Sequence, residues 1–228
     1  MRYHACIVRI YFVRHGETSY NKEGRLQGDR DIPLSETGKA QSKAVAERLW
    51  EEFDRVGEKP AAIYTSLLSR SLDTAKIIGE ELQVSPSPVQ GLQEMDLGEW
   101  EGKTPSELKD SYFDVQNRPL FLQWKEDPTE IRVPGGESIQ DVEKRVTSSL
   151  EQIITLHGST DNVVIVTHCG PISVVLAGLL NGSLKDAAKI KQDSTSVTVL
   201  EVDGDLYHSR VLSVNDSSHL ERLKSRES

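Results

Sequence analysis

Cysteine, runs of basic residues and long apolar segments are scarce in this chain, and each scarcity excludes a class of protein. Only two of the 228 residues are cysteines, Cys6 and Cys169. Two distant thiols favour a reducing compartment over a secreted disulfide scaffold. The 27 basic and 36 acidic residues give a net charge of −9 without any Lys/Arg block. We therefore expect no nucleic-acid partner, because a nucleic-acid-binding surface requires a basic stripe.

The apolar segments give no targeting signal and no membrane span. Arg2, His4 and Arg9 interrupt the first ten residues, so no apolar signal-peptide core forms there. The stretch Val163–Leu180 is long enough for a span, but a Cys-Gly-Pro tripeptide at 169–171 lies near its middle. That interruption favours a buried strand, a turn and a buried helix. We expect a cytoplasmic protein without membrane contact.

Segments rich in β-branched residues alternate with segments of helical periodicity along most of the chain. Strands are predicted at Cys6–Val13, Ala61–Thr65 and Val163–Thr167. Apolar residues at helical spacing predict helices over about 40–56, behind the N-cap Ser35, and over about 72–82, 139–153 and 171–180. This order predicts an α/β fold, a three-layer sandwich whose mostly parallel central sheet is flanked by helices on both faces.

Two regions depart from the alternation. The segment at about 93–134 is aromatic and weakly periodic, which predicts a small inserted subdomain that forms a lid over the substrate; a capping box at 104–107 starts a short helix there. Thr195–Val202 and Tyr207–Leu212 predict a hairpin, and the polar tail after Val214 is expected to fray. At ~100–200 residues per domain, residues 1–228 form a single domain.

Two of the predicted strands end in a histidine. Arg14 and His15 follow the first strand, His168 follows the strand at 163–167, and Arg70 comes shortly after the strand at 61–65. Ligands of open α/β sheets bind at the carboxyl ends of the strands, so we expect these side chains to share one crevice. Two planar guanidinium groups beside two imidazoles suit a tetrahedral dianion such as a phosphoryl group.

Four ordered sequence blocks resemble the histidine phosphatase superfamily, in the branch that contains the cofactor-dependent phosphoglycerate mutases. The first is FVRHGETSYN at 12–21 followed by LSETG at 34–38, and the second is SRSLDTA at 69–75. The third is LQEMDLGEWEG at 92–102, and the last is VTH at 166–168. The resemblance covers about residues 7–180 and implies that superfamily's fold and chemistry.

The resemblance also implies roles for individual residues. His15 would be the nucleophile that forms a phosphohistidine, and Glu94 would protonate the leaving oxygen and then activate water. Glu99 and Glu101 lie close by and are alternatives to Glu94 for this role. The residues implied to contact the phosphate or the rest of the substrate are Arg14, Arg70, His168, Asn21, Arg25, Gln27, Gly28 and Cys169. Three of these residues have alternative interpretations: Arg25 as a surface charge, Asn21 as a turn residue, and Cys169 as a small buried hydrophobe. Cys169 also departs from the many relatives that have glycine after the histidine.

Elementary chemistry is consistent with these roles. A nucleophilic imidazole is neutral at the attacking nitrogen, and a backbone carbonyl on its other nitrogen fixes the tautomer. Phosphoryl transfer needs positive charge around the oxygens, which Arg14, Arg70 and a protonated His168 would provide. No step requires a metal or another cofactor. A cysteine-phosphatase mechanism is excluded, because the position six residues after Cys169 is Val175 rather than arginine.

Hydrolysis is the favoured reaction within the superfamily. Mutases of this branch carry extra arginines after the glutamate block, whereas Ser106–Pro128 holds only Arg118. We therefore expect a phosphomonoesterase acting on a small phosphorylated metabolite, with mutase-type transfer as the alternative. An inactive phospho-ligand binder is less favoured, because both histidines and both arginines are present. A homodimer is possible, since dimers are common in this branch.

Overall fold

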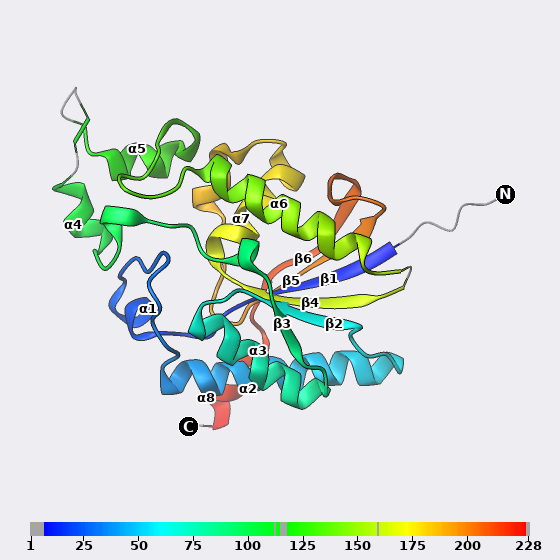
Figure 1. The fold of residues 1–228 in the computed structure, drawn as a ribbon. Helices are drawn as coiled ribbons and strands as arrows, with labels where there is room; N and C mark the ends of the chain where they lie inside the picture. The colour runs from blue at the N-terminus through cyan, green and yellow to red at the C-terminus, as the bar shows by residue number, and fades with distance from the viewer. Residues whose placement is uncertain (1–6, 112, 115–117, 159, 227–228) are drawn as a thin grey trace.

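A mostly parallel sheet forms the middle layer of the molecule. In the computed structural model, the described residues, 7–111, 113–114, 118–158 and 160–226, contain a six-stranded sheet of order β3-β2-β4-β1-β5-β6 (Figure 1). The strands β1 to β4 pair in parallel, and β5 and β6 add an antiparallel edge. This confirms the predicted fold class. The strands are β1 (Ile7–Arg14), β2 (Ala62–Thr65), β3 (Pro86–Pro88), β4 (Asn162–Thr167), β5 (Val197–Asp203) and β6 (Ser209–Asp216).

Helices cover both faces of the sheet. The helices α2 (Glu36–Val56) and α3 (Ser69–Leu82) lie on one face, and α6 (Ile139–Thr155) and α7 (Cys169–Asn181) lie on the other (Figure 1). Alternate residues of β1 serve the two faces: Phe12 packs with the α6 and α7 side chains, and Val13 packs with those of α2 and α3. The helix α2 begins as predicted, because the Ser35 hydroxyl accepts a hydrogen bond from Gly38 N at 3.0 Å.

The segment at about 93–134, which the sequence predicts to be a lid and which is called the lid segment below, is built from short helices. It contains α4 (Pro105–Lys109), whose capping box is formed by Thr104 and Glu107 as predicted, and α5 (Leu120–Glu126). Trp100 is fully buried and meets the rings of Phe121 and Trp124 edge to face, with centroids 5.5 and 5.9 Å apart. Trp100 and Phe121 belong to the same apolar cluster as the side chains of β4, α6 and α7.

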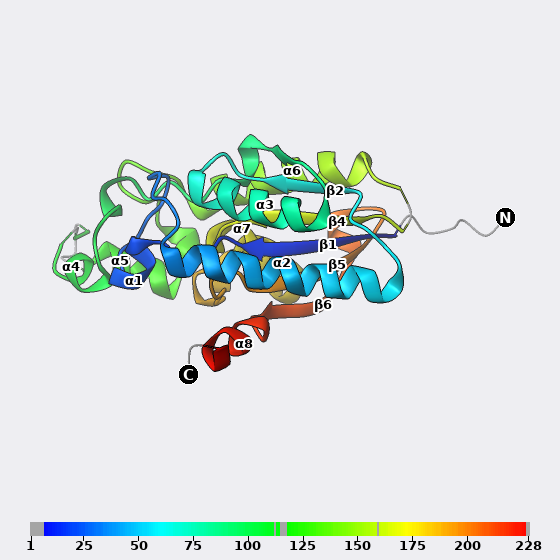
Figure 2. The same cartoon turned by 90° about the horizontal axis from the view of Figure 1, so that it is seen from below.

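The C-terminal segment does not fray, so that prediction was wrong. The strand β6 continues to Asp216, and the helix α8 (His219–Arg226) follows and packs against α2 (Figure 2). Polar composition misled the prediction, because the residue that anchors this helix is the buried His219, which is 5% exposed. Cys6, the expected start of the first strand, lies outside the described residues. Among the residues that the structure does describe, no helix is long and apolar enough to cross a membrane.

Candidate active site

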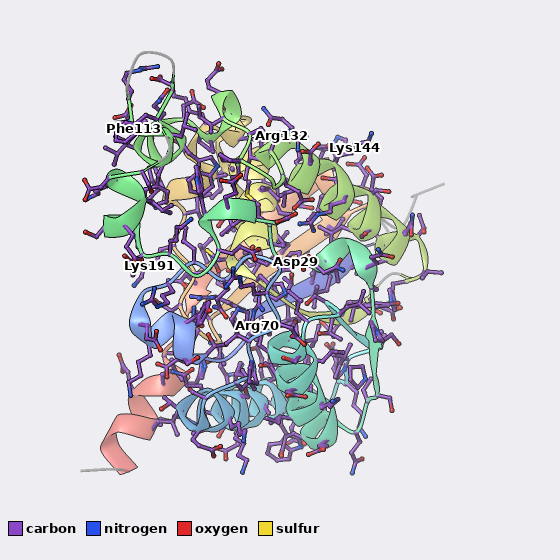
Figure 3. All side chains as sticks on the ribbon, turned by 60° about the vertical axis from the view of Figure 1, so that its left-hand side comes forward. Asp29, Arg70, Phe113, Arg132, Lys144 and Lys191 are labelled. Atoms are coloured by element: carbon purple, nitrogen blue, oxygen red, sulfur yellow. The ribbon has the colours of Figure 1, made fainter. Side chains whose placement is uncertain are left out.

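The ends of three parallel strands bring the predicted catalytic residues together. The neighbours β1 and β4 end in register, with Arg14 opposite Thr167, so His15 and His168 follow side by side. Their ring centroids lie 5.0 Å apart. The strand β2 pairs with the other side of β4, and the helix α3 after it begins at Ser69 and carries Arg70. Figure 3 shows Arg70 close to Asp29, whose negative charge favours the charged form of Arg70. Phe113 lies at the outer end of the lid segment.

The geometry of His15 fixes its tautomer. The ring is buried, and Nδ1 lies 2.7 Å from the carbonyl oxygen of Gly16, so Nδ1–H donates to that oxygen. On the other side, Arg70 Nε donates to His15 Nε2 at 3.3 Å. Burial, together with the charges of Arg14 and Arg70, holds the pKa of His15 well below its ordinary value. The ring is therefore neutral with a lone pair on Nε2, which is the form a nucleophile requires.

Arg70 is held rigidly beside this nitrogen. Its side chain is fully buried, and its terminal nitrogens donate to the carbonyls of Arg30 at 2.6 Å and Gly28 at 2.8 Å. Gly28 has a φ of +56°, and a Cβ there would lie 2.1 Å from a carboxylate oxygen of Glu101, so only glycine fits. The structure thus makes Gly28 a support for Arg70. Gln27 is also a loop support, because its side-chain oxygen accepts from Thr18 Oγ1 at 2.8 Å.

The surroundings of His168 favour a neutral ring, against the expectation of a protonated one. Burial comes first and the charge of Arg70 second among the causes that hold its pKa well below the ordinary value. Its Nε2 lies 2.6 Å from Ser66 Oγ, whereas Nδ1 is buried without a hydrogen-bond partner among the described residues. Sequence reasoning missed Ser66, although its position directly after β2 was a usable signal. When the Ser66 hydroxyl donates to Nε2, the proton of the neutral ring stands on Nδ1.

The other candidate cations and polar groups differ in where they lie. Arg14 is half-buried, donates to the Gln192 carbonyl at 2.5 Å, and has a buried Nε without a partner in the described part of the chain. The Asn21 side chain caps α1 (Ser19–Glu23) by accepting from Thr18 N at 3.1 Å. Arg25 is turned to the lid, where it donates to the Gly102 carbonyl at 2.7 Å. The structure therefore brings Arg14, but not the guanidinium of Arg25, to the His15 cluster.

Glu94 is the carboxylate that shares this cluster. Its Oε1 accepts from Met95 N at 2.9 Å and from Gly170 N at 3.0 Å, in the first turn of α7. A helix N-terminus stabilises a negative charge in this position. The alternative Glu101 is engaged elsewhere, because it accepts from Asp29 N at 2.7 Å and pairs with Arg30 at 3.2 Å, while Glu99 is exposed. The negative charge of Glu94 acts to raise the pKa of both Arg70 and Cys169, so this carboxylate lies near both side chains.

Cys169 behaves as a small, partly buried group. Its Sγ lies 3.8 Å from Ser173 Oγ and 4.0 Å from the Ile190 carbonyl. Burial raises the pKa of this thiol above its ordinary value, so the thiol stays protonated at neutral pH. Its contacts are with α7 and the loop that follows the helix. In the part of the chain that the structure describes, no group of three or more His, Cys, Asp or Glu side chains is arranged to hold a metal.

The close approach of Gly170 to Glu94 gives a prediction about activity. A Cβ at position 170 would lie 2.4 Å from Glu94 Oε1, so Gly170→Ala must displace the carboxylate. We expect kcat to fall about 100-fold, as for a misplaced catalytic group, with a nearly unchanged melting temperature because only the end of a flexible side chain moves. Gly178→Ala in the same helix is the control, since nothing apart from its chain neighbours and the backbone of its own helix lies within 4 Å of the added Cβ. Equal kcat in the two variants would contradict the placement of Glu94.

Comparison with known proteins places these features in one family. The model of the histidine phosphatase superfamily (branch 1) matches residues 10–216. Phosphoserine phosphatase 1 of Hydrogenobacter thermophilus is 31% identical over 214 residues, 94% of this chain and 95% of that protein. The metal-independent phosphoserine phosphatase of Arabidopsis thaliana is 32% identical over 205 residues, 85% and 77% of the two chains.

A solved structure agrees with these sequence relatives. The mycobacterial glucosyl-3-phosphoglycerate phosphatase complexed with VO3 superposes with a TM-score of 0.77 at 30% identity, covering 91% of this chain and 98% of that one. The chain belongs to branch 1 of the histidine phosphatase superfamily.

Proposed function

We propose that the protein is a phosphomonoesterase that hydrolyses small phosphorylated metabolites through a phosphohistidine formed on His15, without a metal. The observation that carries this proposal is the neutral His15 ring, whose Nε2 bears a lone pair and lies 3.3 Å from Arg70 Nε. Relatives named for phosphoserine and glucosyl-3-phosphoglycerate support substrates that carry a carboxylate near the phosphate. We place this activity in the cytoplasm and propose a homodimer, which sedimentation velocity would test.

The reaction has two displacements. In the first, His15 Nε2 attacks phosphorus, the N–P bond forms and the ester P–O bond breaks. Glu94, which takes up a proton because it faces the phosphate dianion, gives that proton to the leaving oxygen. In the second, the Glu94 carboxylate takes a proton from water, the water oxygen attacks phosphorus, and the N–P bond breaks. Arg14, Arg70 and a proton on His168 Nδ1 stabilise the charge on the phosphoryl oxygens. A neutral His168 is sufficient for this role, because one N–H donates.

A substrate panel tests the proposal. We expect phosphate release from phosphoserine, glucosyl-3-phosphoglycerate or p-nitrophenyl phosphate that is unchanged by EDTA, because the proposed steps use only side chains. His15→Ala serves as the blank, and 3-phosphoglycerate with bisphosphoglycerate tests mutase transfer. Turnover abolished by the chelator, or rapid isomerisation with negligible phosphate release, would overturn the proposal.

A further inference from the structure

We propose that His219, in the C-terminal helix, is a positioning residue for the catalytic end of β1, acting through the backbone of Thr195. The inference rests on the proposed role of His15 as nucleophile. His219 does not belong to the strand-end cluster around His15, because its helix α8 packs on α2 beyond the end of β6 (Figure 2). The connection is a short series of hydrogen bonds between α8, the segment before β5, and the end of β1.

The first link is between Thr195 and the catalytic backbone. Thr195 N lies 3.0 Å from the carbonyl oxygen of Arg14 and 3.3 Å from that of His15. One buried N–H thus faces the carbonyls of both residues at the end of β1. On the opposite side, His15 N donates to the Thr167 carbonyl of β4 at 2.9 Å. The backbone that carries the nucleophile is therefore clamped from two sides, by β4 and by Thr195.

The second link is the unusual backbone of Thr195. Its φ is +55°, in the left-handed region that β-branched residues rarely adopt, and its side chain is fully buried. Such a conformation persists only where surrounding contacts over-determine it. The contacts of the Thr195 hydroxyl supply that restraint: Oγ1 donates to the Ser194 carbonyl at 2.8 Å, and lies 3.1 Å from His219 Nε2.

The third link orients His219. Arg48 Nη1, which can only donate, lies 3.4 Å from His219 Nδ1, so Nδ1 accepts and the ring proton stands on Nε2, facing Thr195 Oγ1. Arg48 is fixed in turn by Asp216, which accepts from Nη2 at 2.6 Å through its carboxylate and from Nη1 at 2.9 Å through its carbonyl. With Nε2–H donating, Thr195 Oγ1 is free to donate to Ser194. Each polar group in the series then has a partner of the right kind.

The test compares three α8 variants. His219→Leu removes both hydrogen bonds, His219→Gln keeps a donor near the position of Nε2, and Arg222→Gln changes an exposed side chain of the same helix. A misplaced nucleophile slows chemistry more than binding, so for His219→Leu we expect kcat to fall at least about 10-fold. We expect KM to change much less. His219→Gln should restore most of the loss, and Arg222→Gln should match the wild type.

A second variant and a second readout complete the test. Thr195→Val removes the hydroxyl but keeps the β-branched shape, and it should show the same kcat defect even where His219→Leu does not fold. The ¹⁵N shifts of the His15 ring report its environment without any substrate, so they test the inference separately from the phosphatase proposal. We expect them to move in His219→Leu and Thr195→Val only. Wild-type shifts and kcat in a folded Thr195→Val protein would overturn the inference.

Discussion

Replacing His15 by alanine should abolish turnover, with a loss of about 10⁴-fold or more, because removal of a covalent nucleophile leaves only binding and charge stabilisation. The same substitution should abolish the phosphoenzyme. In the wild type, a ³²P-labelled ester quenched in alkali should leave an acid-labile, base-stable adduct on His15, since phosphohistidine contains an N–P bond. The adduct is measured by phosphopeptide mapping, and its amount against time gives the rate of the first displacement.

The control for this experiment is another histidine of the same chain. His208 is exposed and pairs with Asp205 at 2.8 Å, far along the sequence from the strand-end cluster. We expect His208→Ala to label and turn over as the wild type does. Label on a residue other than His15, or full turnover without the His15 ring, would refute the two-displacement mechanism.

Arg70→Ala is the second substitution with a large expected effect. An arginine that neutralises a transferring phosphoryl group contributes about 10³–10⁵-fold in rate, so we expect a kcat loss in this range. Arg70→Lys should not restore it. An ammonium group cannot reproduce the three directed contacts of the guanidinium, to Gly28 O, Arg30 O and His15 Nε2. Steady-state kinetics on any substrate that the panel identifies give both values.

The same variant should change the pH profile in a definite direction. The Arg70 charge is one of the causes that lower the pKa of His15, so its removal raises that pKa. A higher pKa leaves more of the ring protonated at a given acidic pH, and the acidic limb of kcat/KM therefore moves to higher pH. Arg55→Ala, an exposed change on α2, is the control. An acidic limb that stays in place or moves to lower pH would contradict the assigned contact.

Local patterns predicted most of the fold and the centre of the site. The strand ends just before His15 and His168 were readable because β-branched runs stop abruptly there, and Ser35 and Thr104 are caps that act within one turn. These features depend on neighbours in sequence. The preference for Glu94 over Glu101 came from the family resemblance of the block at 92–102. In the structure the two carboxylates differ in their contacts, because Glu94 accepts from Gly170 N and Glu101 accepts from Asp29 N.

The parts that sequence could not predict depend on burial and on distant contacts. The neutral state of His168 follows from desolvation and from the charge of Arg70, 98 positions earlier in the chain. Arg25 lies in the expected loop, but its guanidinium donates a hydrogen bond to the Gly102 carbonyl of the lid segment instead of joining the His15 cluster. Likewise, the final helix is polar by composition, yet it meets distant parts of the chain. His219 contacts Arg48 and Thr195, and Arg222 pairs with Glu51.

The aromatic centre of the lid segment limits how substrate preference can change. Trp100 and Phe121 are continuous with the apolar cluster between the sheet and the helices α6 and α7, so this segment cannot swing outward as a rigid flap without exposing that interior to water. We therefore expect selection among esters to depend on the exposed side chains of this segment rather than on its aromatic anchor. New substrate preferences on this scaffold would arise by exchanging those exposed side chains, while the anchor formed by Trp100 and Phe121 stays unchanged.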